Sequence, residues 1–241
     1  MPTFEIGEII FPLVSGKYTK ANTVKVGRFL GTGFYISSNG LFITCKHVIE
    51  ALEQRQDLFL GKVYGLFPGN YLPITNIKVH PKFDFACGQV ITKKRTKVLK
   101  PYRGPFALGL EVGAFGYSDA GKEKGCLFLD RRYLKGHISR ISHEPYDFPA
   151  KSLCEVSFSV PSGFSGTALL SDDYQLVGML YGNIESRLQA YSISEVIEGN
   201  STFQEKAYRV TEFGLAHTIG YRQVFYANIL KGAILNGFHG Y

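Results

Sequence analysis

Cysteine is scarce in this sequence, and long apolar runs are missing. Its 241 residues include only four cysteines, with no Cys-x-x-Cys pair and no cysteine–histidine cluster at zinc-binding spacing. We therefore expect reduced thiols instead of a disulfide framework, and neither a structural metal nor another cofactor. No run of about 18 apolar residues occurs, which predicts that no helix of the chain spans a membrane.

The first residues lack the features of an export signal. Glu5 and Glu8 stand where a secretory signal carries basic residues, and Gly7 and Pro12 interrupt the apolar stretch. We therefore expect a cytoplasmic protein, a compartment in which cysteines stay reduced.

The composition is that of a folded protein rich in short strands. Hydrophobic residues make up 45% and charged residues 20%, with 27 glycines and 10 prolines. Short segments rich in β-branched and aromatic residues run from residue 24 to about 90, and about six more follow residue 105. Asn39-Gly40 predicts a tight hairpin turn. Helices are expected only at 47–54 and, from its apolar spacing, at 220–235.

A basic run separates the two sets of strands. The net charge is +7, and the one dense cluster of positive charge lies in residues 93–100, next to prolines and a glycine. We interpret the run as a solvated linker, which makes nucleic acid an unlikely partner. The expected division is therefore an N-terminal lobe over residues 1–95, a linker over 96–105, and a C-terminal lobe over 106–241.

Three short stretches carry residues suited to one reaction. The first is Gly31-Thr-Gly-Phe-Tyr, followed by Thr44-Cys-Lys-His47; the second is Phe83-Asp84-Phe-Ala; the third is Gly163-Phe-Ser165-Gly. A serine hydroxyl becomes a good nucleophile only when a base removes its proton, and histidine is the usual base. A carboxylate that holds the histidine completes such a set.

These stretches resemble the motifs of chymotrypsin-like and trypsin-like serine peptidases, in that family's order of His, Asp and Ser, over roughly residues 24–196. Cys45-Lys46 replaces the usual small pair before the histidine, and Thr167 replaces a glycine, as in bacterial and viral branches. The resemblance implies an all-β fold of two six-stranded antiparallel barrels with a C-terminal helix. His47 and Asp84 would lie in the first barrel and Ser165 in the second.

The resemblance also implies roles for these residues. His47 is the expected base, Asp84 orients it, and the amides of Gly163 and Ser165 form the expected oxyanion hole. Asp57 is a less favoured candidate for the acid, because its surroundings fit an exposed strand start.

The specificity pocket implied by the family has Ser159 at its base. Its walls would come from Tyr181, Gly182, Asn183 and Gln189. None of these residues is acidic. Because a buried basic side chain needs a carboxylate partner, we expect cleavage after uncharged residues.

The expected activity is that of a serine endopeptidase acting on a protein or peptide. The chain looks most like the intracellular, bacterial-type branch, so we expect narrow specificity or control by a regulatory protein partner, by analogy in a stress or defence pathway. Two alternatives stay open from the sequence. One is a binding module without catalysis on the same fold, and the other is a viral-type peptidase that processes a polyprotein.

Overall fold

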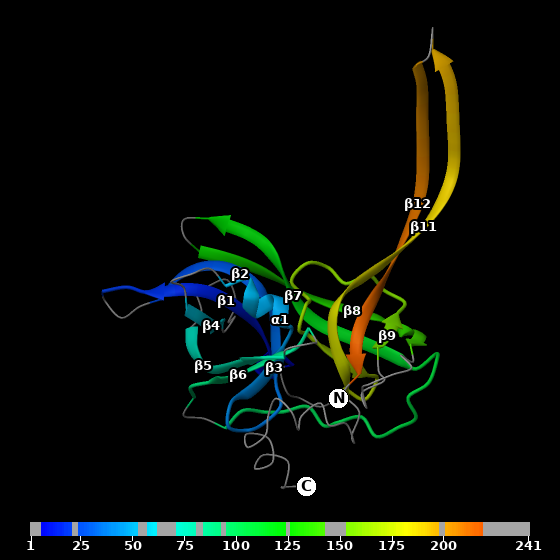
Figure 1. Cartoon of the computed structure of the whole chain (residues 1–241). Helices are drawn as coiled ribbons and strands as arrows, with labels where there is room; N and C mark the ends of the chain where they lie inside the picture. Colours follow the sequence, from blue (N-terminus) through cyan, green and yellow to red (C-terminus); the bar gives the residue numbers. More distant parts are fainter. Residues whose placement is uncertain are drawn as a thin grey trace.

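The computed structural model describes residues 6–20, 24–52, 57–61, 71–80, 84–92, 95–123, 126–142, 153–197 and 201–218. They form two closed antiparallel barrels of six strands each, lying side by side (Figure 1). The expected double-barrel fold is therefore confirmed. The helix expected at 220–235 lies outside the described residues.

The first barrel contains a strand that sequence patterns did not predict. β1 pairs with β2 on one side and with β4 on the other, so the barrel closes only through it. The strand order around the barrel is β1-β2-β3-β6-β5-β4. The strands are β1 (Ile10–Tyr18), β2 (Val24–Tyr35), β3 (Leu41–Thr44), β4 (Asp57–Gly61), β5 (Tyr71–Val79) and β6 (Ala86–Val90), with a 3-10 turn η1 (Ile6–Glu8) and one helix α1 (Lys46–Glu50).

The second barrel closes in the order β10-β11-β12-β9-β8-β7. Two of its strands are much longer than a barrel requires, and they continue outward as a two-stranded arm (Figure 1). The strands are β7 (Glu111–Glu123), β8 (Cys126–Ser142), β9 (Leu153–Val156), β10 (Ala168–Ser171), β11 (Leu176–Ile197) and β12 (Ser201–Thr218).

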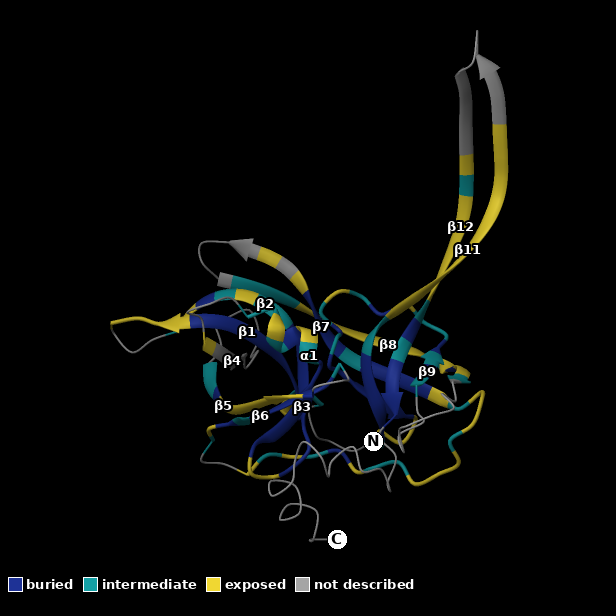
Figure 2. Ribbon diagram, in the orientation of Figure 1, coloured by how far each residue is buried: buried dark blue, intermediate teal, exposed yellow. Residues whose placement is uncertain are grey.

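A shared apolar core joins the two barrels. The largest cluster of buried side chains contains Phe34, Phe42 and Phe85 of the first barrel together with Tyr117 and Met179 of the second. Figure 2 shows this buried region running through both barrels, whereas the arm is mostly exposed. Because burying each large side chain contributes about 1.5–3 kcal/mol, the shared core holds the two lobes together.

The segment between the barrels is bound along its backbone to both of them. Thr96 N–H donates to Ser38 O of the first barrel at 3.0 Å. Leu176 N–H of the second barrel donates to Lys100 O at 2.7 Å, and Leu99 is buried in the shared core. The basic side chains described here, such as Arg95 and Lys100, remain exposed. The segment is therefore a docked connection with a charged outer side.

Three of the four cysteines have side chains that the structure describes. Cys45, Cys87 and Cys154 are buried and free. Burial raises the pKa of Cys87 to about 11 and that of Cys154 to about 12, so both thiols are protonated at neutral pH. No helix in the described ranges has the length and apolar character needed to cross a membrane.

Candidate active site

His47 is positioned by the turn from strand β3 into helix α1. β3 ends at Thr44, and His47 follows in the first turn of the helix. The helix packs closely on β2, because a Cβ added to Gly31 would lie only 2.7 Å from Val48. This close approach explains the glycine at the start of the Gly-Thr-Gly motif.

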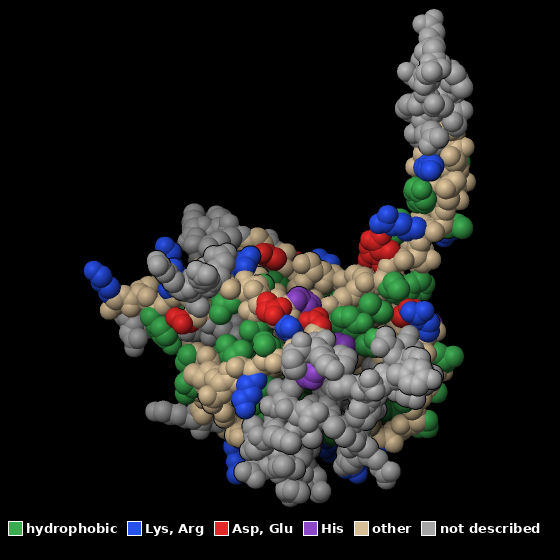
Figure 3. Space-filling model, in the orientation of Figure 1, with side chains coloured by type: hydrophobic (Ala, Val, Ile, Leu, Met, Phe, Trp, Pro, Cys, Tyr) green, Lys and Arg blue, Asp and Glu red, His purple; other side chains and the backbone are tan. Residues whose placement is uncertain are grey.

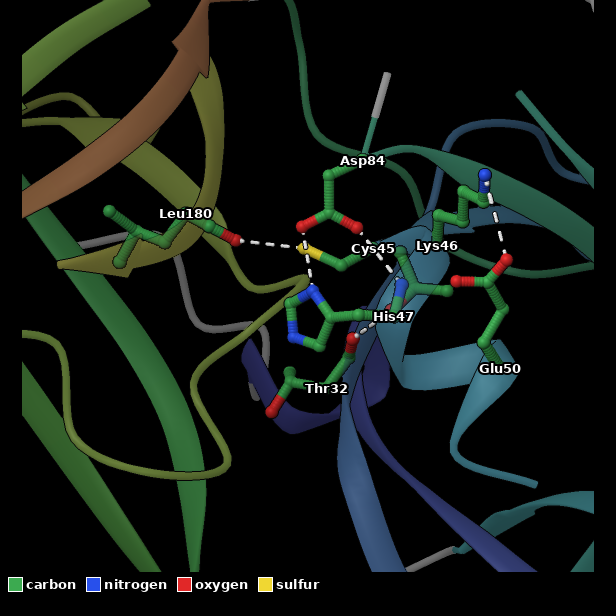
Figure 4. Close-up of polar contacts among 8 residues, drawn as sticks. Thr32, Cys45, Lys46, His47, Glu50, Asp84 and Leu180 are labelled. Carbon is green, nitrogen blue, oxygen red and sulfur yellow. Dashed lines mark hydrogen bonds and ion pairs between the residues drawn. The ribbon is translucent and has the colours of Figure 1, made fainter. Parts of the chain in front are cut away.

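Asp84 binds His47 through both of its carboxylate oxygens. One oxygen lies 2.6 Å from His47 Nδ1, and the other accepts a bond of 2.9 Å from the His47 backbone N–H (Figure 4). Asp84 lies two residues before β6, which pairs with β3, so the sheet register brings the carboxylate to the histidine. With Nδ1–H donating to Asp84, the other ring nitrogen is left as a proton acceptor.

The two bonds keep Asp84 ionised in a half-buried place. Burial alone would raise the pKa of its carboxyl, but the side-chain and backbone hydrogen bonds from His47 lower it by more. The net pKa lies below its usual value. The carboxylate therefore stays charged at neutral pH and favours a protonated imidazole once His47 has taken a proton.

The loop that carries Ser165 is shaped by two glycines with positive φ. Gly163 has φ +93°, and Phe164 N–H donates to Pro161 O at 3.1 Å, the features of a type II turn. Gly166 has φ +87°. Among the described residues, the amides of Gly163 and Ser165 donate to no other backbone group. Both N–H groups are thus available to an acceptor outside the loop.

Thr32 of the first barrel holds this loop. Its backbone N–H donates to Ser165 O at 2.9 Å, and its hydroxyl donates to Gly163 O at 2.7 Å. Its own carbonyl accepts a bond of 2.7 Å from the Thr44 hydroxyl. Thr32 itself is fully buried, and the loop residues that it binds, Gly163 and Ser165, are partly buried. The serine loop is therefore tied to β2 and β3, the strands that lead to His47.

Leu180 makes a second link between the serine loop and the histidine segment. Its carbonyl accepts a bond of 2.8 Å from Gly166 N–H and one of 3.4 Å from the Cys45 thiol, which lies two residues before His47 (Figure 4). Thr167, which stands where the family has a glycine, is buried and donates its hydroxyl to Phe115 O. The substitution therefore fits the barrel without leaving a polar group unbonded.

The Ser165 hydroxyl itself is not engaged. In the described part of the chain it forms no hydrogen bond, either with the His47 ring or with another group. Catalytic hydrogen bonds are often long before substrate binds. The structure thus orders the His47–Asp84 pair and the loop backbone, and leaves the contact between serine and histidine open.

A buried histidine, His217, lies close to Asp84. His217 stacks on Tyr181 with ring centroids 4.3 Å apart. Burial lowers the pKa of His217 to about 4, against the opposing attraction of Asp84 and with the help of His80. Figure 3 shows histidine side chains gathered between the two barrels.

The group formed by Cys45, His47 and Asp84 also has the spacing of metal ligands. Their Sγ, Nδ1 and carboxylate oxygen all lie within 4.8 Å of one another. However, the ring nitrogen and the carboxylate already share a bond of 2.6 Å. Burial, followed by the neighbouring Asp84, raises the pKa of the Cys45 thiol well above its usual value. These contacts favour the hydrogen-bonded arrangement over a metal centre.

The residues expected to form the specificity pocket are only partly brought together. Asn183 bonds both backbone groups of Val160, accepting from its N–H at 2.7 Å and donating to its carbonyl at 2.9 Å. A Cβ on Gly182 would meet no atom within 4 Å, so open space adjoins it. Gln189 lies in the arm opposite Tyr208, about 20 Å along β11 from Gly182. Gln189 is therefore not placed with the others.

Ser159 differs from its expected position at the base of a neutral pocket. It is exposed, and its hydroxyl donates to the Glu212 carboxylate at 2.6 Å. The expectation that only neutral groups face Ser159 was therefore wrong. Glu212 was missed because it is far away in sequence and reaches Ser159 only through the pairing of β12 with β9.

Comparison with known families identifies the class of protein. Residues 31–179 match the trypsin-like peptidase domain, and this range includes His47, Asp84 and Ser165. The match covers more than half of the chain, and the chain belongs to the trypsin-like peptidase family. A search of curated proteins found no significant match.

We predict that Thr32→Val destabilises the protein by about 1–3 kcal/mol, because Gly163 O would lose its buried hydrogen-bond donor. Thr32→Ser keeps the hydroxyl and serves as the matched control. Urea unfolding of both variants measures the difference. Equal unfolding free energies for Thr32→Val and the wild type would contradict a binding role for this hydroxyl.

We predict that His217 makes folding stability fall as the pH drops from about 6.5 to about 4. Its folded pKa is about 4, so over this window the unfolded chain binds a proton that the folded chain does not. This contribution to the free energy of unfolding is fully present above the pKa of His217 in the unfolded chain. About 3 kcal/mol of it is lost by pH 4. Urea unfolding at several pH values should show a shallower dependence for His217→Phe, which keeps an aromatic ring against Tyr181. Parallel curves would contradict the prediction.

Proposed function

We propose that the protein is a serine endopeptidase that acts through an acyl-enzyme intermediate, with His47, Asp84 and Ser165 as its triad. The observation that carries the proposal is the two-oxygen contact between Asp84 and His47. This contact fixes the ring and its tautomer together, which a structural aspartate at a helix start has no need to do. The family match over residues 31–179 supports a serine peptidase in general.

In the proposed reaction, each catalytic group acts once in acylation and once in deacylation. His47 Nε2 takes the proton of the Ser165 hydroxyl while the oxygen attacks a peptide carbonyl. Asp84 stabilises the imidazolium that forms. The same proton then passes to the leaving amine, and a water molecule repeats the sequence to release the acyl group. The uncommitted amides of Gly163 and Ser165 are suited to the carbonyl oxygen as it gains negative charge.

The open contact between Ser165 and His47 supports control of this activity. We propose that a substrate or a regulatory protein closes it by bringing the Ser165 hydroxyl and the His47 ring together. We also propose a cytoplasmic location, in agreement with the free Cys45, Cys87 and Cys154. A peptidase in that compartment needs narrow specificity or a trigger.

We predict that a fluorophosphonate probe labels Ser165, because only an activated serine reacts quickly with such a phosphorus centre. Ser165→Ala should abolish labelling, and Asp84→Asn should slow it by about 10⁴-fold through loss of the histidine tautomer. Intact-mass and peptide mass spectrometry locate the label. Labelling of another residue, or rapid labelling of Asp84→Asn, would contradict the triad.

The proposed specificity is for short, uncharged side chains before the cut. In the family this pocket lies between the segments that here hold Val160 and Asn183, and the two hydrogen bonds between them would restrict a long side chain. Glu212 bonds Ser159, but both residues are exposed. A solvated carboxylate attracts a basic side chain weakly, so we do not propose a preference for Arg or Lys.

We predict that Asn183→Gly shifts cleavage toward longer apolar residues, because it removes the bridge to Val160. Peptide-library profiling should show at least a tenfold gain in kcat/KM after Leu or Phe relative to Ala. Glu212→Gln is the charge control and should leave the profile unchanged. Strong cleavage after Arg or Lys that disappears in Glu212→Gln would overturn the uncharged preference and assign selection to Glu212.

A further inference from the structure

The β11–β12 arm extends well beyond the barrel that it belongs to. β12 contacts β9 only as far as Gly214, and beyond Asn183 and Gly214 the two strands pair only with each other among the described residues. From Ile184 to Ile197 the arm is about 45 Å long. Figure 1 shows it pointing away from both barrels.

The strand register gives the arm two different faces. Residues directly opposite each other in an antiparallel pair point to the same face, and the faces alternate along each strand. A bulge at Ala190 shifts β11 by one residue, so that Ile184, Leu188, Tyr191 and Ile193 all share one face. We call this the apolar face. Other described members of the apolar face are Ser186, Ala207, Arg209, Thr211 and Phe213.

The opposite face is mainly polar. It carries Glu185, Arg187, Gln189, Ser192, Lys206 and Glu212, with Tyr208 and Val210 among them. Without the bulge at Ala190, the apolar positions of β11 would divide between the two faces. The bulge therefore gathers most of the apolar side chains of β11 on one side of the arm.

The apolar face is exposed in the single chain. Ile184 is 39% exposed, Leu188 68% and Ile193 44%. Figure 3 shows hydrophobic and charged side chains at the surface of the lower arm. A two-stranded hairpin has marginal stability in water, and a contiguous exposed apolar patch marks an interaction site. The arm thus has the properties of a surface that packs against another protein surface.

We propose that the apolar face packs against the same face of a second copy of this chain, with the two arms antiparallel. Seven pairs of opposite residues, here called rows, point to this face, from Ile184/Phe213 to Ile197/Ser201. Tyr191/Ala207 is the middle row. A two-fold axis at the middle row places Leu188 of one copy against Ile193 of the other. The same operation sets Arg209 against position 205, which is a glutamate in the sequence. The Leu188 row thus meets the Ile193 row, Arg209 meets position 205, and the polar Ser186/Thr211 row meets positions 195 and 203.

The antiparallel orientation also follows from the shape of the molecule. Each arm points away from its own barrels, so antiparallel arms place the two bodies at opposite ends of the pair (Figure 1). Parallel arms would bring the bodies together and set Arg209 against Leu188 of the other copy. Charge and shape therefore favour the same arrangement.

The size of the face is compatible with a reversible dimer. A two-stranded ribbon about 45 Å long and about 10 Å wide covers about 450 Å² on each copy, or about 900 Å² in total. This lies close to the 1,000 Å² or so that separates specific interfaces from weak contacts. We therefore expect dissociation within the concentration range of ordinary solution measurements.

Sedimentation equilibrium of the full chain tests the proposal, with Ser165→Ala as the background so that self-cleavage does not interfere. Leu188→Ser should weaken the dimer about 100-fold, because each dimer loses two buried leucines. Val210→Ser on the polar face is the matched control and should change the dissociation constant less than threefold. Val210 is 50% exposed, so the control also replaces an apolar side chain that is exposed in the single chain.

A charge reversal tests the orientation. Arg209→Glu alone should weaken the dimer, as should Glu205→Arg alone, and the double variant should recover most of the affinity. Ala207→Cys, in the middle row, should join two copies through a short thiol-reactive cross-linker. Thermal unfolding of each variant shows whether the barrels remain folded, so a loss of dimer in a folded protein has one interpretation.

Results of three kinds would overturn the proposal. The first is a monomer at the highest soluble concentration. The second is equal weakening by Leu188→Ser and Val210→Ser, or no recovery in the charge-reversed double variant. The third is flotation of the monomeric protein with neutral phosphatidylcholine vesicles that depends on Leu188, which would assign the apolar face to a lipid surface. The inference is independent of the proposed catalytic function, because none of its measurements uses activity.

Discussion

Thr32 makes the bonds on which the arrangement of the site depends. It belongs to β2 of the first barrel, yet its N–H and hydroxyl bind carbonyls of the serine loop in the second. Two barrels joined only by an apolar core could slide, because hydrophobic contact has no direction. Hydrogen bonds do have direction, and these come from a fully buried residue. They set the position of Ser165 relative to the strands that lead to His47.

A balance of opposing electrostatic effects maintains the His47–Asp84 pair. Partial burial of Asp84 disfavours its charge, and the two bonds from His47 restore it. His217 lies near the same carboxylate, but its own burial holds it neutral, so it does not compete with His47 as a cation. The Cys45 thiol is likewise kept protonated. Asp84 is therefore paired with His47, while the neighbouring Cys45 and His217 stay neutral.

Strands β11 and β12 form part of the wall of the second barrel and also the exposed arm. Near the barrel, β11 and β12 carry Asn183, which binds Val160, and His217, which lies close to Asp84. Farther out, the same strands form an arm whose sides differ in polarity because of one bulge. The barrel segment is held on both sides by neighbouring strands, whereas the arm is held on neither. The arm can therefore vary in its contacts without disturbing the closed barrel.

Local sequence patterns were sufficient for the strand-rich fold, the hairpin turn at Gly40, and the three stretches that contain His47, Asp84 and Ser165. These features depend on residues close together in the chain or on motifs characteristic of the family. The tertiary structure alone decided the rest. The need for β1 follows from closure of the barrel, and the contact between Glu212 and Ser159 follows from strand pairing. Gln189 lies in the arm, away from the expected pocket, because β11 continues past the barrel. Contacts between residues far apart in sequence depend on register and closure, which no local pattern specifies.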